Sequence, residues 1–242
     1  MIALDTQSVA SKFKALAVVL TGVRRFGLIA ALAVLCVLAA CGHSGTSPRP
    51  STTESSPAEA HVNPANITRA RGALPAGYEF SDLTGPASPV AFWGLGPGWA
   101  AEPTQCGVLA GPATDASTTK GWSASGPGGI VHAAVVGRVT FDPAVLAGCG
   151  QWTVTSGNTT GAVHLVDAPA IDRATTVGMA TDAKTVVEGG NETTSMASTF
   201  SAYLDDYLVF VTVVTDPGSP NPPLGQEFAA DLLVKTVSAL RG

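Results

Sequence analysis

Apolar and polar positions alternate or cluster along much of the chain, in segments of strand length. Such segments, separated by glycine, proline, asparagine and aspartate, are typical of antiparallel β-structure. The predicted strands cover residues 78–83, 130–139, 152–155, 162–166, 175–187, 194–203 and 207–215. The segment 207–215 is apolar on both faces for much of its length, which predicts a central place in the sheet.

The C-terminal segment follows a helical period instead. Within residues 226–240 an apolar stripe is formed by Phe228, Leu232, Leu233, Val237 and Leu240. Asp231 and Lys235 lie outside this stripe at the i,i+4 spacing that favours an ion pair on the solvent side of a helix. Strands followed by a packed helix predict an α+β domain.

Residues 84–129 are rich in glycine and proline and are predicted to be largely irregular, with one helical turn at 104–109. Asp142, followed by Pro143, predicts the N-cap of a short helix. Trp93, Trp99 and Trp122 all lie in the glycine-rich region. Aromatic rings on loops can line a ligand cleft, and we take these three as ligand-binding candidates. The alternative is that they close the open edge of the hydrophobic core.

The N-terminal part predicts export. Arg24 and Arg25 precede about 15 apolar positions that end in Leu38-Ala39-Ala40-Cys41, the layout of a signal peptide. The last four residues resemble a bacterial lipobox, in which the cysteine is acylated and becomes the mature N-terminus. We therefore predict a lipoprotein signal peptide at 1–40 and lipidation of Cys41; the alternative is an uncleaved signal anchor. Residues 41–66, rich in Ser, Thr and Pro, are predicted to be a disordered tether, and 67–242 a single domain.

The cysteines and the net charge indicate a disulfide and limit the classes of partner. Cys36 falls within the signal peptide, so Cys106 and Cys149 remain for the exported domain, where an isolated pair predicts a structural disulfide. Removal of residues 1–40, with four basic residues and one acidic residue, changes the formal net charge from -5 to about -8. Such an acidic chain argues against nucleic-acid partners.

Catalytic and metal-binding motifs are incomplete. Ser123 lies in a sequence that narrowly fails the nucleophile-elbow pattern, because Ser125 replaces its last glycine. A serine hydrolase using Ser123 or Ser125 with His132 as base is therefore an alternative. We predict no catalytic residue, no metal site and no cofactor.

Three segments carry a resemblance to known proteins. They are Phe92-Trp93-Gly94-Leu95-Gly96-Pro97-Gly98-Trp99, Trp122-Ser123-Ala124-Ser125-Gly126-Pro127-Gly128-Gly129 and Phe228-Ala229-Ala230-Asp231-Leu232-Leu233-Val234-Lys235. Together with the lipobox and the tether, they make the chain similar to a mycobacterial lipoprotein family of unknown function. It is more distantly similar to the extracellular sensor domains of PknH-type kinases and to LpqN-type lipoproteins. This resemblance implies a curved, mainly antiparallel sheet of the Mog1/PsbP-like kind, with a cleft for an envelope ligand.

These observations lead to one preferred hypothesis and two alternatives. The preferred hypothesis is a non-catalytic lipoprotein that is held on the extracytoplasmic face of the cell membrane by the lipid on Cys41. It would bind an envelope lipid, glycan, peptide or protein partner, or act as a sensor-like module. The alternatives are the envelope serine hydrolase and a structural or surface-antigen role.

Overall fold

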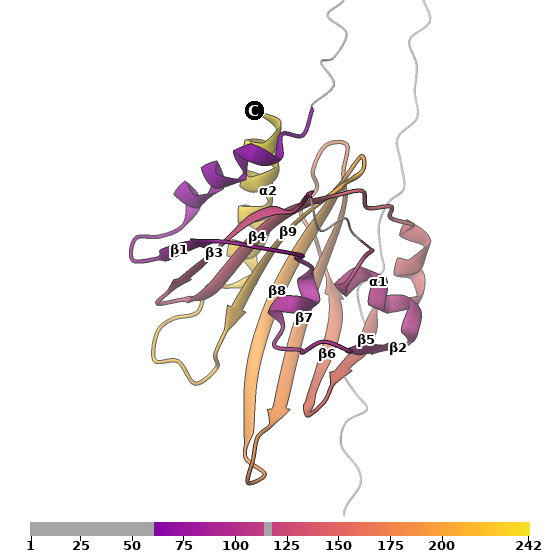
Figure 1. The fold of residues 1–242 in the computed structure, drawn as a ribbon, viewed down its shortest axis with the longest axis vertical. Coiled ribbons are helices and arrows are strands. Elements are labelled where there is room, and N and C mark those ends of the chain that lie inside the picture. The colour runs from indigo at the N-terminus through magenta and orange to yellow at the C-terminus, as the bar shows by residue number, and fades with distance from the viewer. Residues whose placement is uncertain (1–60, 114–117) are drawn as a thin grey trace, which may run out of the picture. The chain divides into compact units, whose positions relative to one another are not determined.

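A computed structural model describes residues 61–113 and 118–242 (Figure 1). The predicted signal peptide, Cys41 and most of the predicted tether lie outside the described residues. Among the described residues, none of the helices is long and apolar enough to span a membrane.

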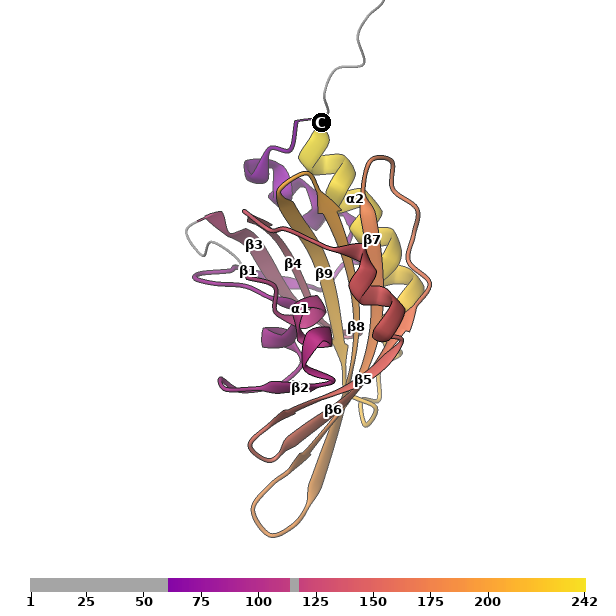
Figure 2. The ribbon, with the colours of Figure 1, turned by 90° about the vertical axis from the view of Figure 1, so that its right-hand side faces the viewer.

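The main element is a nine-stranded sheet in the order β1-β3-β4-β9-β8-β7-β6-β5-β2. Every neighbouring pair is antiparallel. The strands are β1 (Glu79–Asp82), β2 (Ala100–Glu102), β3 (Lys120–Gly126), β4 (Gly129–Gly137), β5 (Gln151–Ser156), β6 (Thr159–Val166), β7 (Thr175–Val186), β8 (Glu192–Leu204) and β9 (Tyr207–Thr215). The doubly apolar β9 lies between β4 and β8, as its sequence predicts. The sheet is curved, with α2 on one face and α1 on the other (Figure 2), so the predicted α+β class is confirmed.

The helices divide between the two faces. They are the α-helices α1 (Gly107–Ala110) and α2 (Gln226–Arg241) and the 3₁₀-helices η1 (Pro64–Ala73), η2 (Pro89–Phe92), η3 (Thr104–Cys106) and η5 (Pro143–Gly148). The predicted N-cap of η5 is present, because the Asp142 carboxylate accepts a hydrogen bond from the Ala144 N–H at 2.9 Å. The predicted ion pair between Asp231 and Lys235 is also present, at 2.6 Å.

One face of the sheet, here called the α2 face, is covered by α2 and η1. The predicted apolar stripe of α2 points inward, and Leu232, Leu233, Val237 and Leu240 are buried against strand residues such as Val211 of β9. The start of η1 is joined to the end of α2, because the Asn63 N–H donates to the Leu240 carbonyl at 2.8 Å. Burial of apolar surface on this scale is the main stabilising term in a domain of this size.

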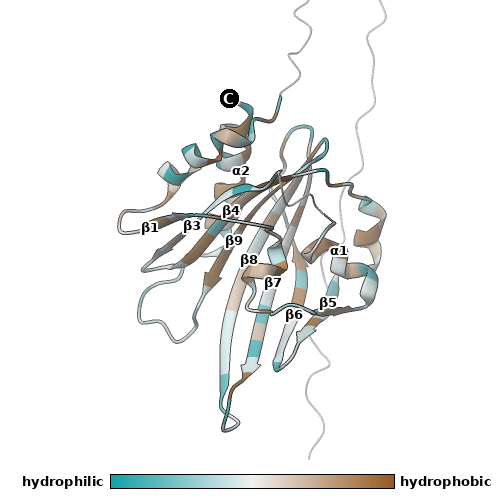
Figure 3. Cartoon of the chain, viewed as in Figure 1, coloured by the Kyte–Doolittle hydropathy of each residue, from teal (hydrophilic) through white to brown (hydrophobic). Residues whose placement is uncertain are grey.

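The other face, here called the cap face, is covered by shorter pieces: residues 87–99, which we call the cap segment, together with η3, α1 and η5. The prediction that residues 84–129 are largely irregular is wrong at β2 and β3. In β3, Trp122 and Ala124 lie on the α2 face and Ser123 lies on the cap face, so a half-buried strand is formed despite its two glycines. Figure 3 shows the apolar character of β4 and β9 and the polar positions along β7 and β8.

Candidate functional site

Two of the three candidate tryptophans are fully buried, and they lie on opposite faces of the sheet. Trp93, directly after η2, belongs to the cap-face core, whereas Trp122 of β3 belongs to the α2-face core. The Trp122 indole N–H donates to the Ile67 carbonyl at 3.0 Å, which ties β3 to η1. The structure therefore does not bring Trp93 and Trp122 together in one cleft, and Trp122 is buried in the α2-face core.

Trp99 lies at the end of the cap segment and is half-buried against the cap-face core. Its ring packs on the glycines that flank and begin α1. A methyl group on Gly111 would lie 2.5 Å from a Trp99 ring carbon, and one on Gly107 would lie 3.3 Å away. Trp99 thus fixes the position of α1, and it shares the cap face with Trp93.

A fourth tryptophan, Trp152, belongs to the same cap-face core and was not among the candidates. Its ring centroid lies 6.1 Å from that of Trp93, within the range at which aromatic pairs attract. Because Trp152 alternates with exposed residues along β5, period-two alternation places it on a buried face. The sequence gives no sign of which buried face this is, since that depends on pairing across the whole sheet.

A row of polar side chains crosses the cap face. By register, Ser123 of β3 lies opposite His132 of β4, His132 lies opposite Thr212 of β9, and Thr212 lies opposite Thr199 of β8. Ser123 Oγ and His132 Nδ1 are hydrogen-bonded at 3.0 Å, and the Thr199 and Thr212 hydroxyls at 2.9 Å. The Trp93 indole N–H donates to Thr199 Oγ1 at 3.0 Å. The cap segment is thus hydrogen-bonded to the polar row.

His132 is the titratable member of this row. It is half-buried, its ring stacks on Phe92 with 3.9 Å between centroids, and burial lowers the pKa of His132 to about 4. At neutral pH the imidazole is therefore uncharged. Ser123 is its serine partner, because Ser125 lies opposite Ile130 instead. An imidazole with so low a pKa is a weak base, so burial makes the pair poorly suited to activate a nucleophile.

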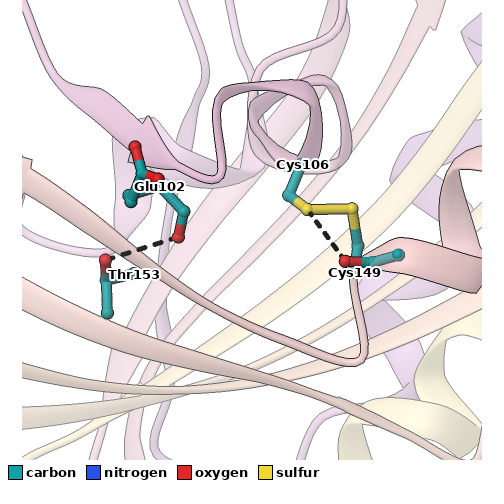
Figure 4. Close-up of a disulfide and its surroundings, with 5 residues drawn as sticks. Glu102, Cys106, Cys149 and Thr153 are labelled. Carbon is teal, nitrogen blue, oxygen red and sulfur yellow. Dashed lines mark hydrogen bonds between the residues drawn. A yellow bond between two sulfur atoms is a disulfide. The ribbon is translucent and has the colours of Figure 1, made fainter.

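The disulfide predicted from the sequence is present between Cys106 and Cys149, both fully buried (Figure 4). It joins the end of η3 to the residue after η5. Nearby, Thr153 Oγ1 donates to the Glu102 carbonyl at 3.5 Å, alongside the β2–β5 pairing. The disulfide therefore fixes the covering of the cap face at its β2 side.

The surface of the domain carries several hollows. One of about 230 Å³ lies between the β3–β4 turn and residues 215–223, with Ile130 and Asp216 among its lining residues. Others, of about 490 Å³ and 440 Å³, lie at the opposite end of the sheet beside Ile171 and Arg173 respectively. Within the described part of the chain, no three His, Cys, Asp or Glu side chains are grouped as a metal site.

Comparison with known families gives one match over most of the chain. The model of a family described as "Domain of unknown function (DUF5642)" matches residues 63–241. No curated protein matches the chain.

Comparison with solved structures shows a similar fold. The chain is similar to an uncharacterized protein from Mycobacterium smegmatis, the Rv0999 ortholog, with 22% identity and a TM-score of 0.55, over 75% of this chain and 98% of that one. It also matches the extracellular domain of PknH from Mycobacterium tuberculosis, with 14% identity and a TM-score of 0.39, over 75% and 92%. The predicted resemblance to a family of unknown function, with distant similarity to PknH-type domains, is confirmed; the similarity to LpqN-type lipoproteins stays a prediction.

Proposed function

The chain belongs to the DUF5642 family, a family of unknown function. Its activity must therefore be inferred from its own residues. We propose that it is a lipid-anchored, non-catalytic module of the cell envelope that binds a ligand on its cap face. The proposed anchor is the lipid on Cys41, and the proposed tether runs from there to just before Val62, because Val62 is buried and the Asn63 N–H is bonded to α2. About 20 flexible residues have an r.m.s. reach near 25 Å, which keeps the domain close to the membrane but free to turn. A buried disulfide suits such an oxidising compartment.

The observation that carries the binding proposal is the hydrogen-bonded contact between the cap segment and the polar row. The Trp93 ring reaches Thr199 in the middle of the sheet and lies beside Trp152. Indole rings over hydroxyl groups combine apolar contact area with hydrogen-bonding partners, as ligand sites do. An envelope lipid, glycan or peptide is the proposed class of ligand.

Native mass spectrometry of the protein purified from its own envelope tests this proposal. We expect a co-purified molecule on the wild type and its loss in Thr199→Val, which removes the hydroxyl that holds Trp93. Trp122→Phe is the matched control, because it alters an indole on the opposite face and should retain the ligand. Equal occupancy in all three proteins, or an empty wild type, contradicts binding at the cap face and favours a structural or surface-antigen role.

The anchor is tested separately by metabolic labelling with an alkyne fatty acid. The wild type should be labelled, and Cys41→Ala should lose the label. Persistent labelling of Cys41→Ala contradicts this acylation site, and an unlabelled wild type contradicts acylation altogether. Neither result depends on ligand binding.

A serine hydrolase is the second candidate, favoured by the 3.0 Å hydrogen bond between Ser123 and His132. Among the described residues, however, no carboxylate is hydrogen-bonded to His132, and its lowered pKa limits its strength as a base. This candidate predicts that a fluorophosphonate probe labels the wild type but not Ser123→Ala. Absence of labelling in the wild type eliminates it.

A further inference from the structure

Polar atoms without partners mark one part of the cap face. Trp152 Nε1 of β5 and Thr181 Oγ1 of β7 are buried and have no hydrogen-bond partner among the described residues, and each side chain belongs to a residue only 2% exposed. Buried polar groups in native proteins are nearly always paired, so each exception requires an explanation. Ser201 Oγ is a third such atom, but its residue pairs with Val177, four residues along β7 from Thr181.

The other two atoms, Trp152 Nε1 and Thr181 Oγ1, belong to residues close to the Trp93–Trp152 ring pair. Trp152 lies opposite Val163 of β6, which in turn lies opposite Thr181. Thr181 is opposite Ala197, which places it diagonally next to Thr199, the acceptor of the Trp93 N–H. Diagonal neighbours of this kind are about 7–8 Å apart, which is a span that a ligand the size of one ring can bridge.

The surroundings are uncharged. From β5 to β9, no described position on the cap face carries Asp, Glu, Lys or Arg; the positions are filled by Thr, Ser, Ala, Gly, Val, Leu, Met and aromatic residues. A charged ligand would lose its hydration without gaining an opposite charge. The chemistry therefore favours a neutral ligand with hydroxyl groups and an apolar side for the indole rings.

The cap segment can separate from the sheet without breaking the strand ladder. Among the described residues, the backbone hydrogen bonds of residues 87–99 are local, such as Trp93 N–H to the Val90 carbonyl. Side chains hold the segment to the sheet: Val90, Trp93 and Leu95 are buried in the cap-face core. Two hydrogen bonds add to this packing, the Trp93–Thr199 bond and a 3.1 Å bond from Ser156 Oγ to the Gly96 carbonyl. On its C-terminal side it is fixed by β2, which pairs with β5. The cap segment is therefore a flap that joins two edge strands.

We propose that this flap covers a site for one neutral sugar ring, in which Trp93 packs on the apolar side of the ring and the Trp152 N–H and the Thr181 and Thr199 hydroxyls bond its hydroxyl groups. The inference rests on the proposed function and names its ligand class. Binding lifts the cap segment, replaces the Trp93–Thr199 bond and gives partners to the two unpaired atoms.

The test uses the mature protein purified in detergent, with glucose, galactose, mannose and N-acetylglucosamine as probes and glucuronic acid as the charged counterpart. We expect at least one neutral sugar to change the tryptophan fluorescence and the amide hydrogen exchange of residues 87–99, and glucuronic acid to have no effect. Thr181→Val should weaken that binding at least tenfold. Thr160→Val, on the exposed side of the neighbouring strand, is the matched control and should bind as the wild type does.

Stability gives a second readout, independent of any sugar. If Thr181 Oγ1 is unpaired in the free protein, Thr181→Val removes a buried polar group and should raise the Tm by about 2–4 °C. A lowered Tm means that a bound water already satisfies the hydroxyl, and it overturns the inference. Absence of binding by all neutral sugars, or equal binding by Thr181→Val, also overturns it. If a lipid or peptide is then found in a Thr199-dependent manner, the proposed function stands without the sugar; if nothing binds, both fail.

Discussion

The two faces of the sheet are covered in different ways, and their side chains differ accordingly. On the α2 face, a 16-residue helix packs on buried aliphatic and aromatic residues such as Val131, Phe200 and Val211. On the cap face, short helical turns cover a row that includes His132, Thr199 and Thr212. A regular helix offers a continuous apolar stripe but few free hydrogen-bonding groups, whereas irregular segments bring indole and carbonyl groups to polar partners. The α2 face is built for stability, and the cap face combines stability with polar chemistry.

The α2 face is covered over only part of the sheet. The helix packs on β8 and β9, and beyond it the same side of β5 to β7 is largely exposed. Thr153, Asp182 and Lys184 occupy exposed positions on that side. In β9 the absence of alternation indicates a strand that is covered on both faces, while the alternation from Ala180 to Lys184 in β7 indicates a segment that is covered on one face. The pattern within each strand therefore records which part of the sheet the helix covers.

Removal of the disulfide is expected to have the largest effect, and it tests how far the cap face depends on this covalent bond. The sequence separation of Cys106 and Cys149 is 43. On the chain-entropy model, opening a loop of this size lowers the free energy of unfolding by about 4 kcal/mol. The double variant Cys106→Ala/Cys149→Ala should show this loss in urea titrations followed by circular dichroism. Reduced wild-type protein is the control, and a loss below about 1 kcal/mol would contradict the expectation.

A truncation on the α2 face should have a slightly smaller effect. Leu233 of α2 is fully buried, and Leu233→Ala leaves a cavity that should lower the free energy of unfolding by about 3 kcal/mol. The next residue, Val234, is 39% exposed, so Val234→Ala is the matched control and should change the stability by less than about 0.5 kcal/mol. Similar values for the two variants, measured by urea titration, would mean that α2 is not packed on the sheet as described.

Local sequence signals predict most of the α2 face and the connections between the strands. The apolar stripe of α2, the twofold burial of β9 and the N-cap at Asp142 each depend on residues close together in the chain, and all three are confirmed. A tight turn precedes β9, with Asp205 in the left-handed conformation at φ 50°. Aspartate tolerates this conformation better than most residues, so the turn chemistry is readable from the sequence.

The cap face could not be read in the same way. β3 contains Gly121 and Gly126, which weaken any strand prediction, and its pairing with β4 decides its conformation. Trp93 and Trp122 look alike in the sequence because both adjoin glycines, yet long-range pairing puts them on opposite faces. The row from Ser123 to Thr199 is assembled from four strands, and only the register of the sheet aligns its members. The helix η1 was missed because it has few apolar positions: Ile67 and Ala70 are its buried residues.

Protonation of His132 should have a somewhat smaller effect on the free energy of unfolding. It tests the cap face alone, because His132 lies on that face. The pKa of His132 is about 4 in the folded protein because of burial, against about 6.5 for an unperturbed histidine. Between these values the unfolded chain binds more protons than the folded one, so the free energy of unfolding falls as the pH is lowered from about 6.5 to about 4. The loss attributable to His132 should be about 2–3 kcal/mol.

Urea titrations between pH 7 and pH 4 measure this dependence, with His132→Gln as the variant that cannot titrate at this position. The wild type should lose about 2–3 kcal/mol more than His132→Gln over this range, because only the wild type has to protonate a ring held between Phe92 and the sheet. Ser123→Ala removes the hydrogen-bond partner but keeps the imidazole, and it should retain most of the dependence, since burial is the cause of the shift. Parallel curves for the wild type and His132→Gln would show that the ring is open to solvent, and the cap face would then be less closed than the contact between Phe92 and His132 indicates.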